Sequence, residues 1–362
     1  MKKAIILLGI FAALPTWALQ LKYIGETEIK LDAQFKKTTI GGISALAWGN
    51  DRLYALSDDK GGKNEPRFYE FELKINKKKV TLKPKEVRFI VGLPDENGKK
   101  AGMDPEGMVR LTTGDLLISS EGNNNAKPRE MPRIFQVTRE GKWILDVPVP
   151  DKYLPEATGM QTKGIDNNKA FEGLSLTPTE SSLFVGMEGS LIQDIPVPPS
   201  DKGEIIRILR YEKKESWKPT QEFAYRMEPF VTNDIGPQVF QGVSEILALS
   251  DSKVIVLERG VRISLKKIYS NRVTLYIADF SKATNTLDKD KLDDKVVLAE
   301  KVKLLDFETD LKNVRKKSVD NFEALAWGPT LPDGKKTLLM MTDNNFNKTQ
   351  KMQLVVFAVE GE

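Results

Sequence analysis

One pattern occurs five times along the chain and constrains the fold more than any other feature. Each copy contains a short apolar strand, a turn rich in Gly, Asp, Ser or Pro, and a second apolar strand that ends at an acidic residue. This pattern is typical of a β-hairpin. The copies begin at Gly42, Gly107, Gly173, Gly242 and Ala324, and are therefore 65, 66, 69 and 82 residues apart. A repeat of this kind indicates an array of similar structural units.

Two further strands are predicted after each hairpin. The third strand opens with a cation in every unit, at Arg67, Arg133, Arg207, Arg272 and Lys351. A more polar fourth strand follows in the first four units, whereas the fifth unit reaches the C-terminus after three strands. The segment from Leu19 to Ile29 supplies a matching strand at the other end of the chain. An N-terminal strand that completes the last unit closes a β-propeller and protects its sheet edges.

We therefore predict an all-β fold, a β-propeller of five four-stranded blades closed by the N-terminal strand. Six blades remain an alternative, because two units could be merged in the longer interval before Ala324. A two-domain β protein with coincidental similarity between its hairpins is the other alternative. No long amphipathic helix competes with the strands, and the charged residues 281–295 are predicted to form a solvated loop.

The first eighteen residues have the pattern of a secretory signal peptide. Lys2 and Lys3 precede the apolar run from Ala4 to Leu14, and Thr16-Trp17-Ala18 offers a small-residue cleavage site. We expect residues 1–18 to be removed and residues 19–362 to form a single domain, exported to the periplasm or the extracellular space. No later stretch has the roughly 20 apolar residues of a membrane helix, so no membrane insertion is expected.

The composition excludes several classes of site. The chain contains no histidine and no cysteine, which rules out Ser-His-Asp and Cys-His nucleophile systems, imidazole zinc sites and disulfides. Its 55 basic and 51 acidic residues leave a formal net charge of only +4. Because these charges are interspersed along the chain, we expect no nucleic-acid partner.

Acidic residues are predicted to gather at one end of the propeller. The start of the first strand of an antiparallel hairpin lies beside the end of the second. The residues that end the second strands are Asp58, Glu121, Glu188, Glu258 and Asp343. The residues just before three of the first strands are Glu106, Glu172 and Glu323, in a slot assigned to Gly41 and Gln241 in the other units. Long connections, including residues 151–170 and 189–203, are predicted at the same rim, where sites are usually built.

Two interpretations of these carboxylates are open. In the first, each strand-ending acid forms an ion pair with the cation that opens the next strand: Asp58 with Arg67, Glu121 with Arg133, Glu188 with Arg207, Glu258 with Arg272, and Asp343 with Lys351. In the second, the acids form a site whose mutual repulsion is relieved by a bound cation or by protons. Ligands that are all oxygen favour Ca²⁺, with Mg²⁺ as the alternative.

The order of the motifs resembles a known family. The succession GGISALAW…LYALSDD, DPEGM…GDLLISSEG, FEGLSLTP…LFVGMEG and FEALAWGP…LLMMTDN is similar to the phytase-like family, "esterase-like activity of phytase". The resemblance extends over almost the whole mature chain. It implies a secreted β-propeller and, by the family's name, hydrolysis of phosphate esters.

The function predicted from the sequence is that of an exported, metal-dependent hydrolase of phosphate monoesters. The predicted catalytic residues are Glu106, Glu172 and Glu323. The predicted metal ligands are Asp58, Glu121, Glu188, Glu258 and Asp343. The predicted substrate-binding residues are Arg129, Arg133 and Arg259. We expect a monomer with a small phosphorylated substrate; the alternative is a non-catalytic envelope propeller that binds a ligand or protein partner through the same rim.

Overall fold

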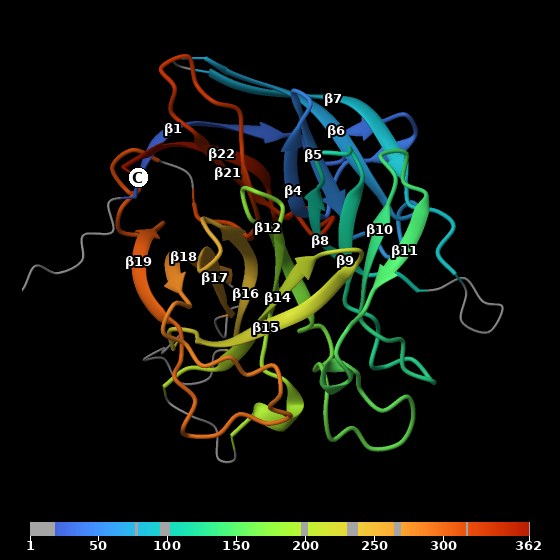
Figure 1. The fold of residues 1–362 in the computed structure, drawn as a ribbon. Helices are drawn as coiled ribbons and strands as arrows, with labels where there is room; N and C mark the ends of the chain where they lie inside the picture. The colour runs from blue at the N-terminus through green and yellow to red at the C-terminus, as the bar shows by residue number, and fades with distance from the viewer. Residues whose placement is uncertain are drawn as a thin grey trace, which may run out of the picture.

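Five four-stranded antiparallel sheets are arranged around one axis as a five-bladed β-propeller (Figure 1). The structure, a computed structural model, describes residues 19–76, 79–94, 102–196, 202–229, 238–263, 269–315 and 318–361. The prediction of five blades is therefore confirmed, and the alternatives of six blades and of a two-domain protein are wrong. The predicted signal peptide lies outside the described residues.

The four strands of each blade follow one another in the chain, except in the last blade. Blade 1 contains β4 (Ile43–Gly49), β5 (Arg52–Ser57), β6 (Arg67–Asn76) and β7 (Lys79–Phe89). Blade 2 contains β8 (Pro105–Arg110), β9 (Leu116–Ser120), β10 (Arg133–Val137) and β11 (Trp143–Val147). Blade 3 contains β12 (Phe171–Leu176), β13 (Ser182–Met187), β14 (Ile205–Lys213) and β15 (Trp217–Arg226).

Blade 4 contains β16 (Gln238–Ala248), β17 (Lys253–Ile263), β18 (Tyr269–Asp279) and β19 (Glu300–Asp306). Blade 5 contains β20 (Phe322–Trp327), β21 (Thr337–Thr342), β22 (Met352–Glu360) and β1 (Gln20–Ile29). The hairpin of β2 (Gln34–Phe35) and β3 (Thr38–Thr39) precedes blade 1, and the 3-10 turns η1 (Asp151–Tyr153) and η2 (Ile192–Asp194) lie in the long connections. Among the described residues, no helix has the length and apolar character needed to cross a membrane.

The N-terminal strand closes the ring, as the sequence predicts. Strand β1 pairs antiparallel with β22 from Gln20 opposite Glu360 to Ile29 opposite Met352, and the two lie side by side in Figure 1. The Tyr23 ring packs edge-on against Phe357, and Glu26 accepts a hydrogen bond of 2.7 Å from Arg315. Closure therefore combines a full strand ladder, apolar packing and a largely buried ion pair.

The apolar core lies between neighbouring blades. Each blade has apolar residues on both faces of its sheet, so each face packs against the next blade. Leu339 and Val356 of blade 5, for example, share a buried cluster with Leu46 and Leu53 of blade 1. Similar clusters join blades 1 and 2, blades 2 to 4, and blades 4 and 5. The innermost strands β4, β8, β12, β16 and β20 contact one another in ring order.

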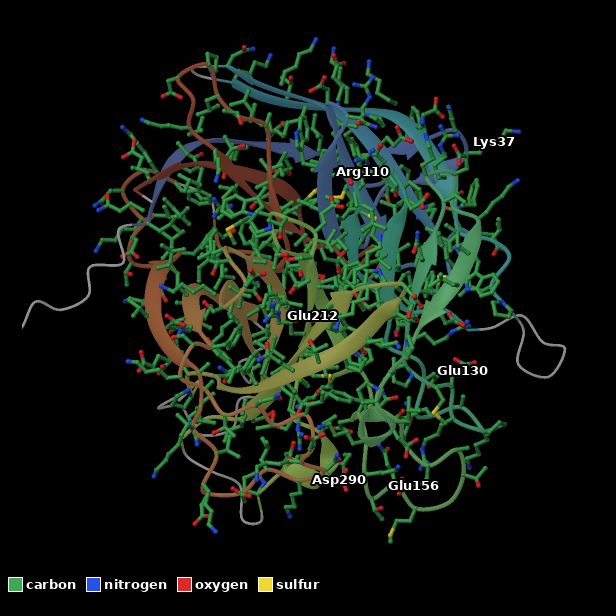
Figure 2. All side chains as sticks on the ribbon, in the orientation of Figure 1. Lys37, Arg110, Glu130, Glu156, Glu212 and Asp290 are labelled. Atoms are coloured by element: carbon green, nitrogen blue, oxygen red, sulfur yellow. The ribbon has the colours of Figure 1, made fainter. Side chains whose placement is uncertain are left out.

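A connection of blade 4 reaches over to blade 3. Residues 280–299 form no helix or strand, as predicted, but they are not simply solvated: Thr286 is fully buried and donates its backbone N–H to the carbonyl of Glu222 in β15. Ala299 donates in the same way to Ala224. The connection thus covers part of the outer edge of blade 3, and Figure 2 shows Asp290 on the same side of the molecule as Glu130 and Glu156.

The innermost strands approach so closely that one position must be small. A Cβ added to Gly107 of β8 would lie 2.4 Å from the carbonyl oxygen of Glu172 and 2.6 Å from Ser119 Oγ. The backbone carbonyl belongs to β12 of the next blade and cannot simply rotate away. The glycine therefore sets the spacing of blades 2 and 3 at the axis.

Gly107→Ala is expected to lower the free energy of unfolding by about 1–3 kcal/mol, the usual effect of forcing extra volume into a packed interior. The matched control is Gly62→Ala, where the nearest atom to the new Cβ is 3.7 Å away. We expect this control to leave stability nearly unchanged. Chemical denaturation of both purified variants measures the difference, and equal stability of the two would contradict the close approach.

Candidate functional site

The same β-bulge recurs in all five innermost strands and defines equivalent positions around the axis. In each blade the pairing of the first two strands shifts immediately after Ile43, Pro105, Phe171, Val243 or Phe322. The next residue lies in the bulge, and this bulge position holds Ser44, Glu106, Glu172, Ser244 and Glu323. The slot assigned from the sequence to Gly41 and Gln241 therefore belongs to two serines.

A second equivalent position lies on the second strand, beside the bulge. The strand ends just before it in blades 1, 2, 3 and 5, whereas in blade 4 the ladder continues through it, with Arg259 opposite Gly242. The residues just before the five bulges pair with residues of the second strands, namely Ser57, Ser120, Met187, Glu258 and Thr342. The residue after each, the strand-end position, is Asp58, Glu121, Glu188, Arg259 or Asp343. In blade 4 this position is occupied by Arg259, whereas the sequence comparison had assigned it to Glu258, one residue earlier.

The structure brings seven of the eight predicted carboxylates together. Each of them is close enough to at least one other for its charge to shift the neighbour's titration: Asp58, Glu106, Glu121, Glu172, Glu188, Glu323 and Asp343. We call these seven residues and Asp104 the carboxylate rim. Asp104 was missed as a site residue, although it is the first residue of the DPEG motif. Its backbone carbonyl accepts a hydrogen bond from the N–H of Glu121.

Glu258 does not belong to the rim. Its carboxylate accepts hydrogen bonds from the Tyr225 hydroxyl at 2.6 Å and from Lys301 Nζ at 2.9 Å. The side chain is therefore held between blades 3 and 4 by partners of its own. Its predicted role as a metal ligand has no support in this geometry.

Two cations lie within the carboxylate rim. Lys60 forms an ion pair with Asp104, and its side chain is more than half exposed. Arg259 Nη2 lies 3.3 Å from Glu323 and 3.5 Å from Glu188. The rest of its guanidinium is held by Ser244, which accepts from Nε at 3.0 Å, and by Asn321, which accepts from Nη1. Among the described residues, these are the two cations in ion-pair contact with the eight carboxyl groups, and Lys169 acts on Glu188 from farther away.

Burial of these acids disfavours their charged forms. Burial, with a smaller contribution from neighbouring carboxylates, raises the pKa of Asp58 to about 7, that of Glu121 to about 8 and that of Glu188 to about 7.

The pKa values of four further rim acids change in the same direction. Burial raises the pKa of Glu106, Glu172 and Asp343 well above the usual range, and like charges nearby add to the effect. For Glu323, burial raises the pKa while Arg259 opposes the shift. The rim therefore holds protons near neutral pH unless a cation replaces them.

Some carboxylate oxygens at the rim have no hydrogen-bond partner. Asp104 Oδ1 and Asp343 Oδ2 are buried and have no hydrogen-bond partner among the described residues. Asp104 is 5% exposed and Asp343 is 0% exposed. Buried polar atoms are otherwise almost always paired in native proteins. Both oxygens are therefore able to accept a further bond.

The other two predicted substrate-binding arginines lie elsewhere. Arg129 donates to the backbone carbonyls of Glu156 at 2.6 Å and Gly159 at 2.8 Å, and so holds the 151–170 connection. Arg133 forms an ion pair with Asp146 at 2.8 Å within blade 2. Of the three arginines, only Arg259 is placed among the carboxylates.

The ion pairs predicted within each unit are also wrong in the first three units, and in the fourth unit Glu258 contacts Lys301. The observed partners are Asp59 for Arg67, Asp146 for Arg133, Asp194 and Glu222 for Arg207, and Lys301 for Glu258. In these three units the strand-ending acids are therefore not neutralised by the cations that open the next strands. Ion pairing within the unit does not explain why these acids are present.

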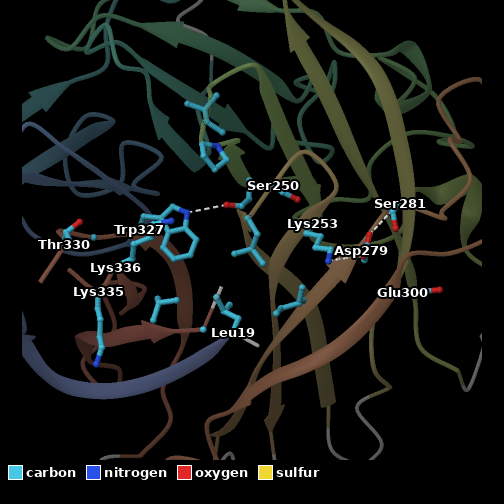
Figure 3. A pocket seen from close by; sticks show the side chains of 18 of the residues that line it. Leu19, Ser250, Lys253, Asp279, Ser281, Glu300, Trp327, Thr330, Lys335 and Lys336 are labelled. Carbon is cyan, nitrogen blue, oxygen red and sulfur yellow. Dashed lines mark hydrogen bonds and ion pairs between the residues drawn. The ribbon is translucent and has the colours of Figure 1, made fainter. Parts of the chain in front are cut away.

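Two cavities among the described residues are candidates for the functional site. One of about 420 Å³ adjoins the carboxylate rim and is lined by Lys60, Asp104, Glu130 and several asparagines. A larger one of about 1190 Å³ lies at the opposite end of the blades, where the hairpin turns of blades 4 and 5 meet (Figure 3). Its wall includes Trp327 and Lys253, and this lysine faces Asp279 at 3.4 Å. The larger cavity lacks a cluster of unpaired charges, so the carboxylate rim is the candidate site.

Three comparisons place the chain among known proteins. The model of the phytase-like family, described as esterase-like activity of phytase, matches residues 38–346. An uncharacterized secreted protein of Arthroderma benhamiae is 25% identical over 225 residues, which make up 55% of this chain and 42% of that protein. The match thus spans less than half of the relative's length.

Solved structures with a similar overall course of the chain are more distant. A glycosyl hydrolase from Bacteroides ovatus has a TM-score of 0.42 and 9% identity, with 95% of both chains covered. An exo-1,5-alpha-L-arabinanase from a bovine ruminal metagenomic library has a TM-score of 0.40 and 9% identity, covering 91% of this chain and 99% of that one. Likeness at this level carries no functional information.

The raised pKa values predict an unusual dependence of stability on pH. In the presence of a chelator, the folded rim retains protons that the unfolded chain has already released, because the unfolded carboxyls titrate near pH 4–4.5. The free energy of unfolding should therefore fall as the pH rises from 5 to 8. A decline of about 1.4 kcal/mol or more, the equivalent of one pKa unit, is expected from denaturation at several pH values. A profile that is flat or rises with pH would contradict the raised pKa values.

Proposed function

The chain belongs to the phytase-like family, and from that premise we propose that it is an exported hydrolase of phosphate monoesters that works with a divalent cation at the carboxylate rim. Family membership supports a hydrolytic enzyme. The match to a secreted relative supports export. The finer assignments, the phosphate ester and the cation, rest on the chemistry of the rim.

The rim residues fit a hard divalent cation. They offer carboxylate oxygens and no imidazole or thiolate, and this ligand set suits Ca²⁺ or Mg²⁺ rather than zinc. The excess of carboxylates over cations and the unpaired Oδ1 of Asp104 both favour an added positive charge. Two sets of residues are placed to hold it, Asp104 with Glu106 and Glu121, and Glu121 with Glu172 and Glu188. A cation bound there would polarise a phosphoryl oxygen and lower the pKa of a coordinated water.

Arg259 is the residue best suited to orient the phosphate. It occupies the strand-end position that holds an acid in the other four blades, and this single replacement gives the ring of carboxylates a positive side. Its Nη2 contacts with Glu188 and Glu323, at 3.5 and 3.3 Å, are longer than the 2.7–2.9 Å typical of strong charge-assisted hydrogen bonds. Nη2 can therefore exchange these contacts for phosphate oxygens, while Ser244 and Asn321 keep the guanidinium in place.

Glu323 is the best candidate for the general base. Its side chain is 13% exposed and lies beside Arg259, so that it faces the position assigned to the phosphate. Asn321 Nδ2 donates a hydrogen bond of 2.8 Å to its Oε1, which orients the carboxylate. Burial raises its pKa towards the range in which a base is effective at neutral pH. Glu323 would take the proton of the attacking water.

Serine nucleophiles do not fit the site. Ser119 Oγ accepts the N–H of Gly107 at 2.8 Å, and Ser120 Oγ accepts the N–H of Asp104 at 2.9 Å. Ser244 accepts from Arg259. These hydroxyls hold the bulges and the arginine, and the chain has no histidine to activate them.

The position of Arg259 among the carboxylates is the observation that carries the proposal, and phosphate release tests it. Purified mature protein should release phosphate from p-nitrophenyl phosphate with Ca²⁺ and not with a chelator. Arg259→Lys should lower kcat/KM by about 10- to 100-fold, since loss of a charged hydrogen bond costs about 1.5–3 kcal/mol. Glu323→Gln should lower kcat by about 10²- to 10⁴-fold.

Arg133→Lys is the matched control, because Arg133 pairs with Asp146 away from the rim. It should keep wild-type rates. If folded, calcium-saturated protein releases no phosphate from p-nitrophenyl phosphate or phytate, the hydrolase is excluded and the non-catalytic binding propeller takes its place.

A further inference from the structure

Two groups of rim carboxylates share one residue. Asp104, Glu106 and Glu121 each offer an oxygen within 4.8 Å of the others, and so do Glu121, Glu172 and Glu188. The first group comes from blade 2 and the residue that precedes it, and the second joins blade 2 to blade 3. Glu121 is only 2% exposed, and its Oε1 accepts the backbone N–H of Ala170 at 2.5 Å. The shared residue is thus fixed between the two groups.

The spacing within each group suits one calcium ion. Ca²⁺ binds oxygen at about 2.3–2.6 Å, so two oxygens on opposite sides of one ion are at most about 4.6–5.2 Å apart. The 4.8 Å limit that holds within each group satisfies this condition for both sets of three oxygens. The five carboxylates form two groups rather than one, because the 4.8 Å condition holds within each set and not across all five, so one ion does not reach both sets equally.

An acidic cluster alone would not indicate a ligand, but the rim has a second feature that does. Asp104 Oδ1 is enclosed without a partner in a residue that is 95% buried, and the other oxygen of the same carboxylate is bound by Lys60. An enclosed, unpaired carboxylate oxygen needs a proton or a cation. In the second group Arg259 approaches only Glu188, at 3.5 Å, which leaves Glu121 and Glu172 without a cation in hydrogen-bond contact among the described residues.

We propose that the rim binds two calcium ions that share Glu121, one held by Asp104 and Glu106 and the other by Glu172 and Glu188. The proposal deepens the proposed function, since both ions belong to the same site. It also assigns different roles to the three glutamates of the bulge position: Glu106 and Glu172 each bind one ion, whereas Glu323 binds none. The two ions lie on the side of blades 2 and 3, and Arg259 of blade 4 faces them.

Calcium titration of the chelator-treated mature protein by isothermal calorimetry tests the proposal without any substrate. The wild type should bind two ions. Glu106→Gln and Glu172→Gln should each bind one, and Glu121→Gln should weaken both sites by at least tenfold. Glu323→Gln is the matched control from the same bulge position and should still bind two. Each substitution removes a like charge from the rim, so all variants should fold in chelator, which circular dichroism and thermal melting will verify.

The double variant Glu106→Gln/Glu172→Gln separates two sites from one. It should bind no calcium, while each single variant keeps one ion. A wild-type stoichiometry of one or zero overturns the proposal, and so does the loss of all binding in either single variant. The outcome is distinct from that of the proposed function: two bound ions without phosphate release would exclude the hydrolase alone, and phosphate release with one bound ion would exclude only the second site.

Discussion

The crowding of the five innermost strands around the axis is the constraint on which both the fold and the site depend. Each strand has a bulge at the same level, and a bulge turns an extra side chain out of the regular alternation. The residue after the bulge faces the neighbouring blade, and in four of the blades it is glycine or alanine: Ala45, Gly107, Gly173 and Ala324. In three blades the bulged residue is a glutamate, and Glu106, Glu172 and Glu323 lie close enough for Glu172 to be affected by the other carboxylates of the rim.

Blade 4 departs from this rule in a way that the packing explains. Its residue after the bulge is Glu245, which is 1% exposed. A Cβ on Gly173 would come within 2.7 Å of Glu245 Oε1, so the glycine of blade 3 makes the space for the glutamate of blade 4. Glu245 Oε1 accepts the N–H of Ile246 at 3.0 Å, and burial raises the pKa of Glu245 well above the usual range. This acid is therefore accommodated by a hydrogen bond and by protonation rather than by a cation.

The sequence was sufficient for the architecture because the repeated hairpins and the isolated N-terminal strand carry information at the scale of whole strands. It was less reliable at the scale of single residues. The alternation of apolar residues does not reveal an extra residue in a ladder, so the comparison was displaced by one residue on the second strand of the fourth unit and by three residues on the first strands of units one and four. Because of the displacement on the second strand, Glu258 was assigned to the strand-end position of blade 4, and the cation that occupies this position, Arg259, was not recognised. Asp104 was missed because its position near the other carboxylates depends on the turn before β8, which the strand pattern of the sequence does not reveal.

The ion pairs failed as predictions because strand neighbours were treated as side-chain neighbours. Arg67 lies opposite Ser57 in the ladder, next in sequence to Asp58, yet its guanidinium reaches Asp59 at 2.8 Å. Asp59 also accepts the backbone N–H groups of Gly62, Lys63 and Asn64. Three backbone donors of this loop hold the Asp59 carboxylate, and the long Arg67 side chain extends to the same carboxylate.

A comparison within the molecule shows why the rim differs from an ordinary buried polar network. In blade 3, Arg207 donates to Glu222 at 2.6 Å and to Asp194 at 2.6 Å, and Lys152 also donates to Glu222, at 3.0 Å. These two cations and two anions balance, and the hydroxyls of Tyr153 and Thr286 complete the coordination of Glu222. The same chain thus neutralises deeply buried charges fully where only structure is at stake.

At the rim the balance is absent, because among the described residues eight carboxyl groups have ion-pair contacts only with Lys60 and Arg259, and Lys169 acts on Glu188 from farther away. Clustered acids of this kind oppose folding, because burial and mutual repulsion both disfavour their charged forms. A purely structural role would be met better by pairs like those of blade 3. The excess of negative charge therefore supports the proposed binding of cations at the rim, and Arg259 gives one edge of the site the positive charge that the proposed anionic substrate requires.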